Sequence, residues 1–248
     1  MKWTIALLLL LMQFSAIGQS DQISSYFGIQ YKSILPNNFV GSKILNLSEQ
    51  EFSSTCEQKV GYLIGATVRA GITKLIAFET GINLVHRNFQ IDMSVPDSNL
   101  YAQTDLSLLS YDIPLNCLIY IKLSKAWYSN ASLGFSMVYK PSMIQSVTGL
   151  NYGHVFTYLG ATQRKFSADF NANIGFEFRS KTSGFFYLGG SARIPLEPLF
   201  ILAGQYRNEG YSLLSYGDIN GSFISIDLKY FFPNTKSNGS TFRPGPIE

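Results

Sequence analysis

The chain has 248 residues, a net charge of +3 and only 14% charged residues. Its cationic charge is too small and too dispersed for nucleic-acid binding, which needs many basic side chains gathered against phosphates. With two His and two Cys, it also lacks the ligands for a metal site at a recognised spacing. Aromatic residues reach 15%, which suits a β-structure with one face in lipid.

The first 18 residues have the features of a secretory signal peptide. Lys2 gives a positive start, residues 5–12 are a short apolar run, and Ala16 and Gly18 place small side chains where signal peptidase inspects them. Cleavage is predicted after Gly18. A retained anchor is the alternative, but the run is short for a hydrocarbon core of about 30 Å.

Eight segments then alternate between apolar and polar side chains. In chain order they cover residues 27–32, 60–69, 76–84, 111–122, 127–140, 166–179, 186–194 and 224–232. A period of two puts the two kinds of residue on opposite faces of a strand. The pattern predicts an all-β fold, an eight-stranded antiparallel transmembrane β-barrel with its strands in an up-and-down meander. A soluble secreted β-sandwich is the alternative.

The connections between these segments alternate in length. Tight turns are expected near 71–74, 124–126 and 180–184, whereas the other connections, at 33–59, 92–103, 141–165 and 208–220, are long and polar. Short periplasmic turns and long outer loops are typical of bacterial outer-membrane barrels, so we expect this location. Two more strands within the long connections, one including residues 155–159, would give ten strands and a wider lumen.

Charged side chains on the polar parity are expected to plug the lumen. An eight-stranded barrel is only wide enough for side chains to fill it, and buried charges need partners. The predicted lumen charges are Arg69, Glu79, Asp112, Lys122, Asp169, Glu177, Arg179, Arg193, Asp227 and Lys229, with Lys140 on the same parity. Their mixed signs predict a network of ion pairs.

Aromatic residues gather at the predicted periplasmic rim, where they would form half of an interfacial belt. The belt residues are Trp127, Tyr128, Phe185, Phe186, Tyr230 and Phe232. In the outer loops, Phe39, Tyr152, Phe156 and Tyr158 are available for contacts with partners or for packing against the barrel rim. The barrel domain would span residues 19–232, followed by a disordered periplasmic tail at 233–248.

Two stretches resemble the PorT-like outer-membrane β-barrel family of Bacteroidetes. Residues 110–120, which include Ile113-Pro114-Leu115, look like the "leIPl" strand of that family. The strand that ends at Phe232 in aromatic residues resembles a terminal signal for the barrel assembly machinery. The resemblance implies an outer-membrane location, and a role in protein secretion for some members.

No catalytic arrangement or cofactor motif is recognised. Glu79 and Glu177 could be imagined as an acid/base pair, but their spacing indicates no substrate cleft. His86 and His154 lie in or near outer loops, and no Gly-x-Ser-x-Gly elbow accompanies them. Cys56 and Cys117 are expected to be unpaired.

The sequence therefore predicts a non-enzymatic envelope protein with a plugged lumen, which acts as a structural or interaction protein through its outer loops. Its expected partners are outer-membrane lipid, the barrel assembly machinery and envelope or secretion proteins. A small-solute pore or transporter is the alternative.

Overall fold

The computed structural model describes residues 25–38, 42–73, 75–141, 144–149, 154–162, 164–180, 183–208, 210 and 212–233. The predicted signal peptide (1–18) and all but the first residue of the predicted tail (233–248) lie outside this part. No helix within it is long and apolar enough to cross a membrane.

Thirteen strands and one short 3-10 helix make up the described residues. They are β1 (Ser25–Pro36), β2 (Ile44–Glu49), β3 (Phe52–Gly71), β4 (Ile76–Val95), η1 (Pro96–Ser98), β5 (Leu100–Lys122), β6 (Trp127–Tyr139), β7 (Ile144–Gly149), β8 (Val155–Ala161), β9 (Phe166–Ser180), β10 (Gly184–Pro195), β11 (Phe200–Arg207), β12 (Ser212–Ile219) and β13 (Phe223–Phe231).

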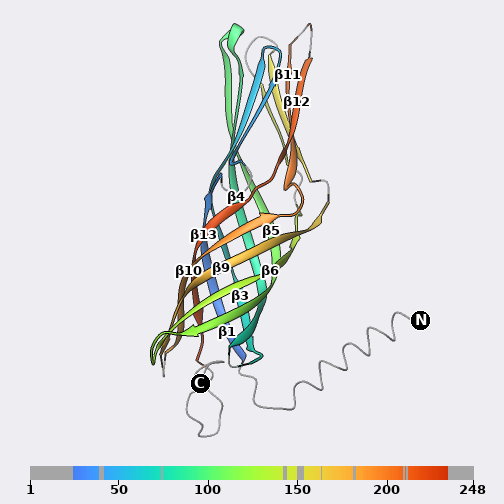
Figure 1. The fold of residues 1–248 in the computed structure, drawn as a ribbon. Helices are drawn as coiled ribbons and strands as arrows, with labels where there is room; N and C mark the ends of the chain where they lie inside the picture. Colours follow the sequence, from blue (N-terminus) through green and yellow to red (C-terminus); the bar gives the residue numbers. More distant parts are fainter. Residues whose placement is uncertain are drawn as a thin grey trace, which may run out of the picture.

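Eight of these strands close into a barrel (Figure 1). Their order is β1-β13-β10-β9-β6-β5-β4-β3, and β1 also pairs with β3, which completes the ring. All ladders are antiparallel, and each ring strand lies beside the ring strands that precede and follow it along the chain. The predicted eight-stranded meander is confirmed, and each of the eight alternating segments lies in one ring strand, apart from Lys140 and Phe232 just past the ends of β6 and β13.

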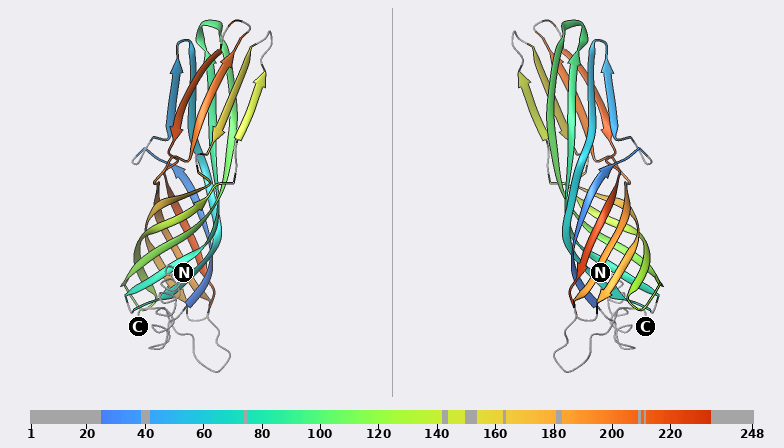
Figure 2. Two further views of the ribbon diagram at one scale, coloured as in Figure 1. Left: turned by 90° about the vertical axis from the view of Figure 1, so that its right-hand side faces the viewer. Right: turned by 90° about the vertical axis from the view of Figure 1, so that its left-hand side faces the viewer.

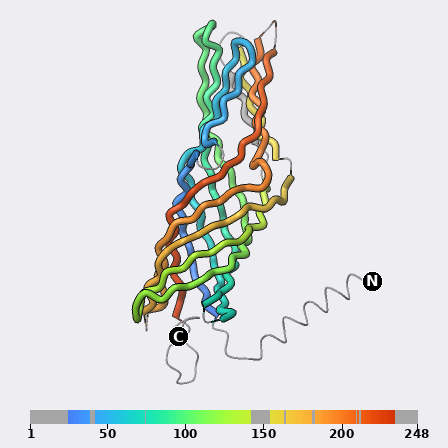
Figure 3. Tube along the Cα trace, viewed as in Figure 1, coloured from blue at the N-terminus to red at the C-terminus, as the bar shows by residue number. Residues whose placement is uncertain are grey.

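The connections predicted to be long loops are largely strands, which build an extension beyond the barrel (Figures 1 and 2). Figure 3 shows β4 and β5 running from the barrel into this extension. There the outer parts of β3, β4 and β5 join β2 in one sheet, and β12-β11-β8-β7 form a second sheet. The prediction of loops is wrong here, because β2 pairs with β3 and β7 with β8 as hairpins, while β11 joins β8 to β12.

Residues 155–159 do form a strand, as considered for a ten-stranded barrel. That strand, β8, pairs with β7 and β11 in the second sheet and does not enter the barrel wall. The ring therefore keeps eight strands, and its lumen stays narrow.

The polarity of the two faces inverts between the barrel and the extension. On β4, Ile82 points outward from the barrel and is 64% exposed, while Asn83 beside it is buried in the lumen. Farther along the same strand, Gln90 points outward, whereas Phe89 is 1% exposed and lies in an apolar core between the two sheets. An apolar outer wall suits lipid and a polar one suits water, so the inversion marks a membrane boundary.

An irregularity in β3 changes which alternate residues of this strand point inward. The β3–β4 register shifts between Lys59 and Tyr62, as a β-bulge does. As a result Cys56 and Leu63, which have opposite parity, both point inward and are buried. The bulge lies where the polarity of the wall changes.

Candidate functional site

The lumen holds nine of the ten charged residues predicted for it, and five of these form a cluster near the short turns. The Arg69 guanidinium, on β3, contacts Glu79 Oε2 on β4 at 2.6 Å and also forms an ion pair with Glu177 on β9. Lys229 Nζ lies 2.5 Å from Glu79 Oε1, and Arg179 Nε lies 2.6 Å from Glu177 Oε1. All five side chains are buried, so three cations share two anions.

Aromatic rings line the same end of the lumen and cover the guanidinium groups. Arg179 Cζ lies 4.0 Å from the ring centroid of Tyr128 and 5.0 Å from that of Phe185. Arg69 Cζ lies 4.1 Å from the ring centroid of Phe231. Such cation–π contacts stabilise cations that are removed from water.

Two of the six predicted belt residues therefore do not face lipid. Tyr128 and Phe185 are each only 2% exposed and point into the lumen, because each is the sequence neighbour of an outward residue, Trp127 or Phe186. The remaining belt residues, Trp127, Phe186, Tyr230 and Phe232, lie on the outer surface.

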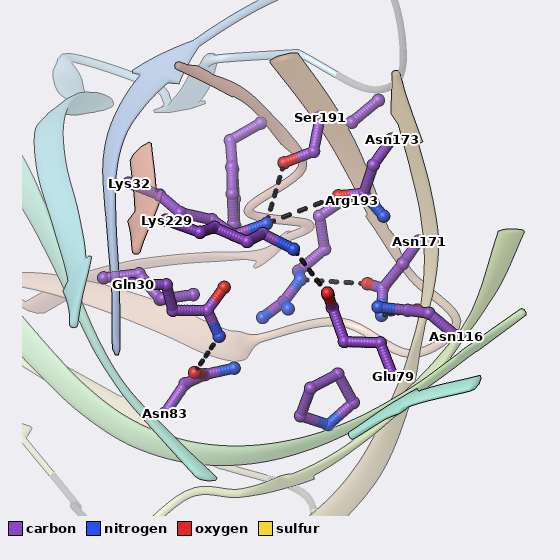
Figure 4. A pocket seen from close by; sticks show the side chains of 14 residues that line it. Gln30, Lys32, Glu79, Asn83, Asn116, Asn171, Asn173, Ser191, Arg193 and Lys229 are labelled. Atoms are coloured by element: carbon purple, nitrogen blue, oxygen red, sulfur yellow. Dashed lines mark hydrogen bonds and ion pairs between the residues drawn. The ribbon is translucent and has the colours of Figure 1, made fainter. Parts of the chain in front are cut away.

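A middle layer of the lumen joins charged and amide side chains (Figure 4). Lys32 Nζ lies 2.6 Å from Asp227 and donates hydrogen bonds to Asn173 and Ser191. Gln30 donates a hydrogen bond to Asn83 across the strands. This layer separates the cluster near the turns from a second cluster at the waist, which is the level where the barrel meets the extension.

At the waist below the extension, two arginines meet two aspartates. Arg193 Nη2 lies 2.5 Å from Asp112, and Arg87 Nη2 lies 3.6 Å from Asp169. Both guanidinium groups also lie near the ring of Phe223, at 5.6 Å and 5.1 Å. An apolar collar of Ile34, Leu63, Val85 and Phe223 closes the same level.

The cavity found between these layers is small. A cavity lined by residues that include Lys32, Glu79 and Arg193 measures about 10 Å³, which is room for about one water molecule. The polar side chains thus touch one another rather than line an open channel.

Two charged lumen residues were missing from the predicted set, and one predicted residue lies elsewhere. Lys32 is on the polar parity of its segment, and Arg87 continues the inward parity of β4 beyond the predicted end of that segment. Lys122 is exposed at the end of β5, 5.8 Å from the ring centroid of Tyr128.

The residues considered for loop contacts and for chemistry have other surroundings. Phe156 and Tyr158 are buried in the core of the extension, whereas Phe39 and Tyr152 fall outside the described residues. His86 stacks on Tyr62, 4.9 Å between centroids. Glu79 and Glu177 both contact Arg69, and Glu79 borders the lumen cavity of about 10 Å³.

The other histidine, His154, precedes β8 in the extension. Its Nδ1 lies 2.6 Å from the hydroxyl of Tyr206 on β11, and the two rings are stacked. Both histidines are therefore engaged with tyrosines, far from each other along the chain.

No family model matches the chain, and no curated protein is similar to it in sequence. Among solved structures, the outer membrane protein OprG from Pseudomonas aeruginosa is similar at a TM-score of 0.50 and 10% identity, over 85% of this chain and 97% of that chain. The β domain of the Bordetella autotransporter BrkA aligns with a TM-score of 0.22 and 10% identity, over 84% and 99% of the two chains. By fold, the chain is an outer-membrane β-barrel whose apolar outer wall suits a bacterial outer membrane.

Proposed function

We propose that this chain is a non-enzymatic outer-membrane protein that acts through its extension, as a structural and interaction protein of the cell envelope. The observation that carries the proposal is the filled lumen. Ion pairs, amides and aromatic rings leave a cavity of only about 10 Å³, so a solute would have to displace buried ion pairs to pass.

The extension supports an interaction role because it presents polar sheet surfaces beyond the membrane boundary. Its own apolar core, which includes Phe52, Phe89 and Phe156, fixes the strands in place. Surfaces held on a rigid scaffold are suited to specific recognition, whereas a barrel that only anchored itself in lipid would not need such a core.

The resemblance of Ile113-Pro114-Leu115 and of the aromatic terminal strand to the PorT-like family adds a finer version of this proposal. In that version the chain is an accessory of a protein-secretion or other envelope complex. Outer-membrane lipid would surround the inserted barrel, and the barrel assembly machinery would be its partner during insertion.

Electrical recording from the purified protein in a planar lipid bilayer tests the proposal. We expect no steady openings, with an established porin recorded in the same bilayers to show that openings are detectable. Steady openings of the unmodified protein would overturn the proposal and favour the alternative, a small-solute pore.

A further inference from the structure

One edge of the extension has no strand beside it in the described part of the chain. β5 pairs with β4 from Leu100 onward, but its pairing with β6 begins only at Tyr111. Residues 100–110 therefore have a ladder on one side only. β7, the edge strand of the second sheet on that side of the extension (Figure 2), pairs with β8 and has no ladder to β5.

The opposite seam of the extension is closed by side chains. A Cβ atom at Gly217 on β12 would lie 2.7 Å from the Leu47 side chain and 3.0 Å from that of Leu45, both on β2. Side chains of β2 and β12 therefore pack together along this seam, whereas the β5 edge has no neighbouring strand among the described residues.

The β5 edge lacks the devices that usually protect exposed strand edges. Between residues 100 and 110 there is no proline, no lysine and a single charge, Asp105. Tyr101 is 58% exposed, and Gln103 and Asp105 are exposed on the same face. At about 3.3 Å per residue, this edge offers roughly 30 Å of unpaired backbone.

The charged side chains on the outer part of the β4–β5 hairpin are all negative. From residue 88 to residue 121 there are four aspartates and neither lysine nor arginine. Asp112 lies in the lumen, but Asp92, Asp97 and Asp105 belong to the outer part of the β4–β5 hairpin. A second copy paired edge to edge would bring these aspartates together, and like charges across a ladder are destabilising.

We propose that the β5 edge at residues 100–110 docks an extended, basic segment of a partner polypeptide, which adds a strand to the sheet. Backbone hydrogen bonds supply the affinity in this mode of recognition, and alternate side chains supply the specificity. Lysine or arginine at every second position would lie beside Asp105, and Asp92 would be one strand farther across the sheet, opposite Gln103. This inference rests on the proposed interaction role and names the chemistry of the partner.

The test uses the folded full-length protein in detergent and a fluorescent ten-residue peptide of alternating valine and lysine. We expect saturable binding in fluorescence anisotropy, and a peptide with glutamate in place of lysine should bind at least about tenfold more weakly. A lysine peptide that is N-methylated at alternate residues on its pairing edge keeps its charge but loses hydrogen-bond donors, and its binding should be lost.

Substitutions in the protein test whether the peptide binds at the β5 edge. Asp105→Lys should weaken binding of the lysine peptide about three- to tenfold, whereas Glu57→Lys, on the outer face of β3, should change it little. In a Cys117→Ser background, Gln103→Cys should form a disulfide with a cysteine-bearing peptide, and Thr55→Cys on β3 should not.

Equal binding of the methylated and unmethylated peptides, no binding at all, or self-association of the protein through this edge would overturn the inference. If the bilayer recording shows no openings and the peptide also fails to bind, only the proposed edge site is refuted. The plugged barrel is then unaffected. Steady conductance would remove the proposed function, whatever the peptide does.

Discussion

Glu177 is the anion that links two buried arginines, Arg69 and Arg179. Replacing it by glutamine leaves the two guanidinium groups with less negative charge in a lumen that excludes water. Because removing one partner of a buried ion pair typically costs about 3–5 kcal/mol, we expect Glu177→Gln to lower the free energy of unfolding by about that amount.

Urea unfolding in lipid vesicles measures this effect. Glu57→Gln is the matched control, since Glu57 pairs with Lys59 at 2.7 Å on the outer face of the extension and should cost less than about 1 kcal/mol. Equal losses in the two variants would contradict a structural role for the lumen network.

Gly189 and Gly190 are neighbours on β10 with different surroundings. A Cβ atom at Gly189 would lie 2.3 Å from the Tyr187 hydroxyl and 2.5 Å from the Ile174 carbonyl oxygen, whereas the nearest atom to one at Gly190 is 3.5 Å away. We expect Gly189→Ala to be destabilising by about 1–3 kcal/mol, because the tyrosine and the backbone of β9 must shift.

Gly190→Ala should be nearly neutral by comparison. The two alanine variants differ by one position, so their urea midpoints in vesicles can be compared directly. If Gly190→Ala proved the more damaging of the two, the inward packing of Tyr187 over this strand would be refuted.

At the scale of one strand, β5 runs from the barrel wall into the extension, so its outward positions face lipid at one end and water at the other. Leu115 and Gln103 share the outward face, and the first belongs to the barrel wall while the second belongs to the extension. Leu115→Arg should cost about 2–4 kcal/mol and reduce the fraction of folded protein in vesicles, because a lipid-facing arginine is unfavourable.

Gln103→Arg should leave folding unchanged, because its side chain is in water. The readout is the fraction of protein whose gel mobility shifts on heating, since a closed barrel resists SDS when it is cold. Equal loss in both variants would contradict the membrane boundary that the polarity inversion indicates.

For the whole molecule, the barrel and the extension have separate cores, so one should be able to loosen without the other. Phe156 is 0% exposed in the core of the extension, and Cys56 lies in the same core. Burial raises the pKa of the Cys56 thiol to about 12, so at pH 8 the thiol stays protonated and unreactive until the extension opens.

Phe156→Ala should destabilise the extension by about 3–5 kcal/mol. In a Cys117→Ser background, we expect Cys56 to react faster with a maleimide at pH 8, while the heat-dependent gel shift of the barrel persists. Loss of the gel shift together with faster labelling would show that the two cores unfold as one unit.

Local alternation is what made the eight ring strands predictable. In segments such as 166–179, apolar and polar side chains alternate so regularly that strand, face and lumen side follow from the chain itself. The same rule could have shown that Tyr128 and Phe185 point inward, because neighbours in a strand face opposite ways. Arg87 lies outside the predicted segment because the alternation of β4 continues past residue 84.

The sequence by itself determined eight barrel-strand segments, their meander order and most of the charges that face the lumen, because these follow from a repeat of two and from short turns. Only the tertiary structure decided that the long connections lengthen the barrel sheet and help to build a second sheet, since β8 and β11 lie about 40 residues apart and their pairing leaves no local pattern. It also decided which charges meet, as Arg69 reaches Glu177 only once the ring has closed.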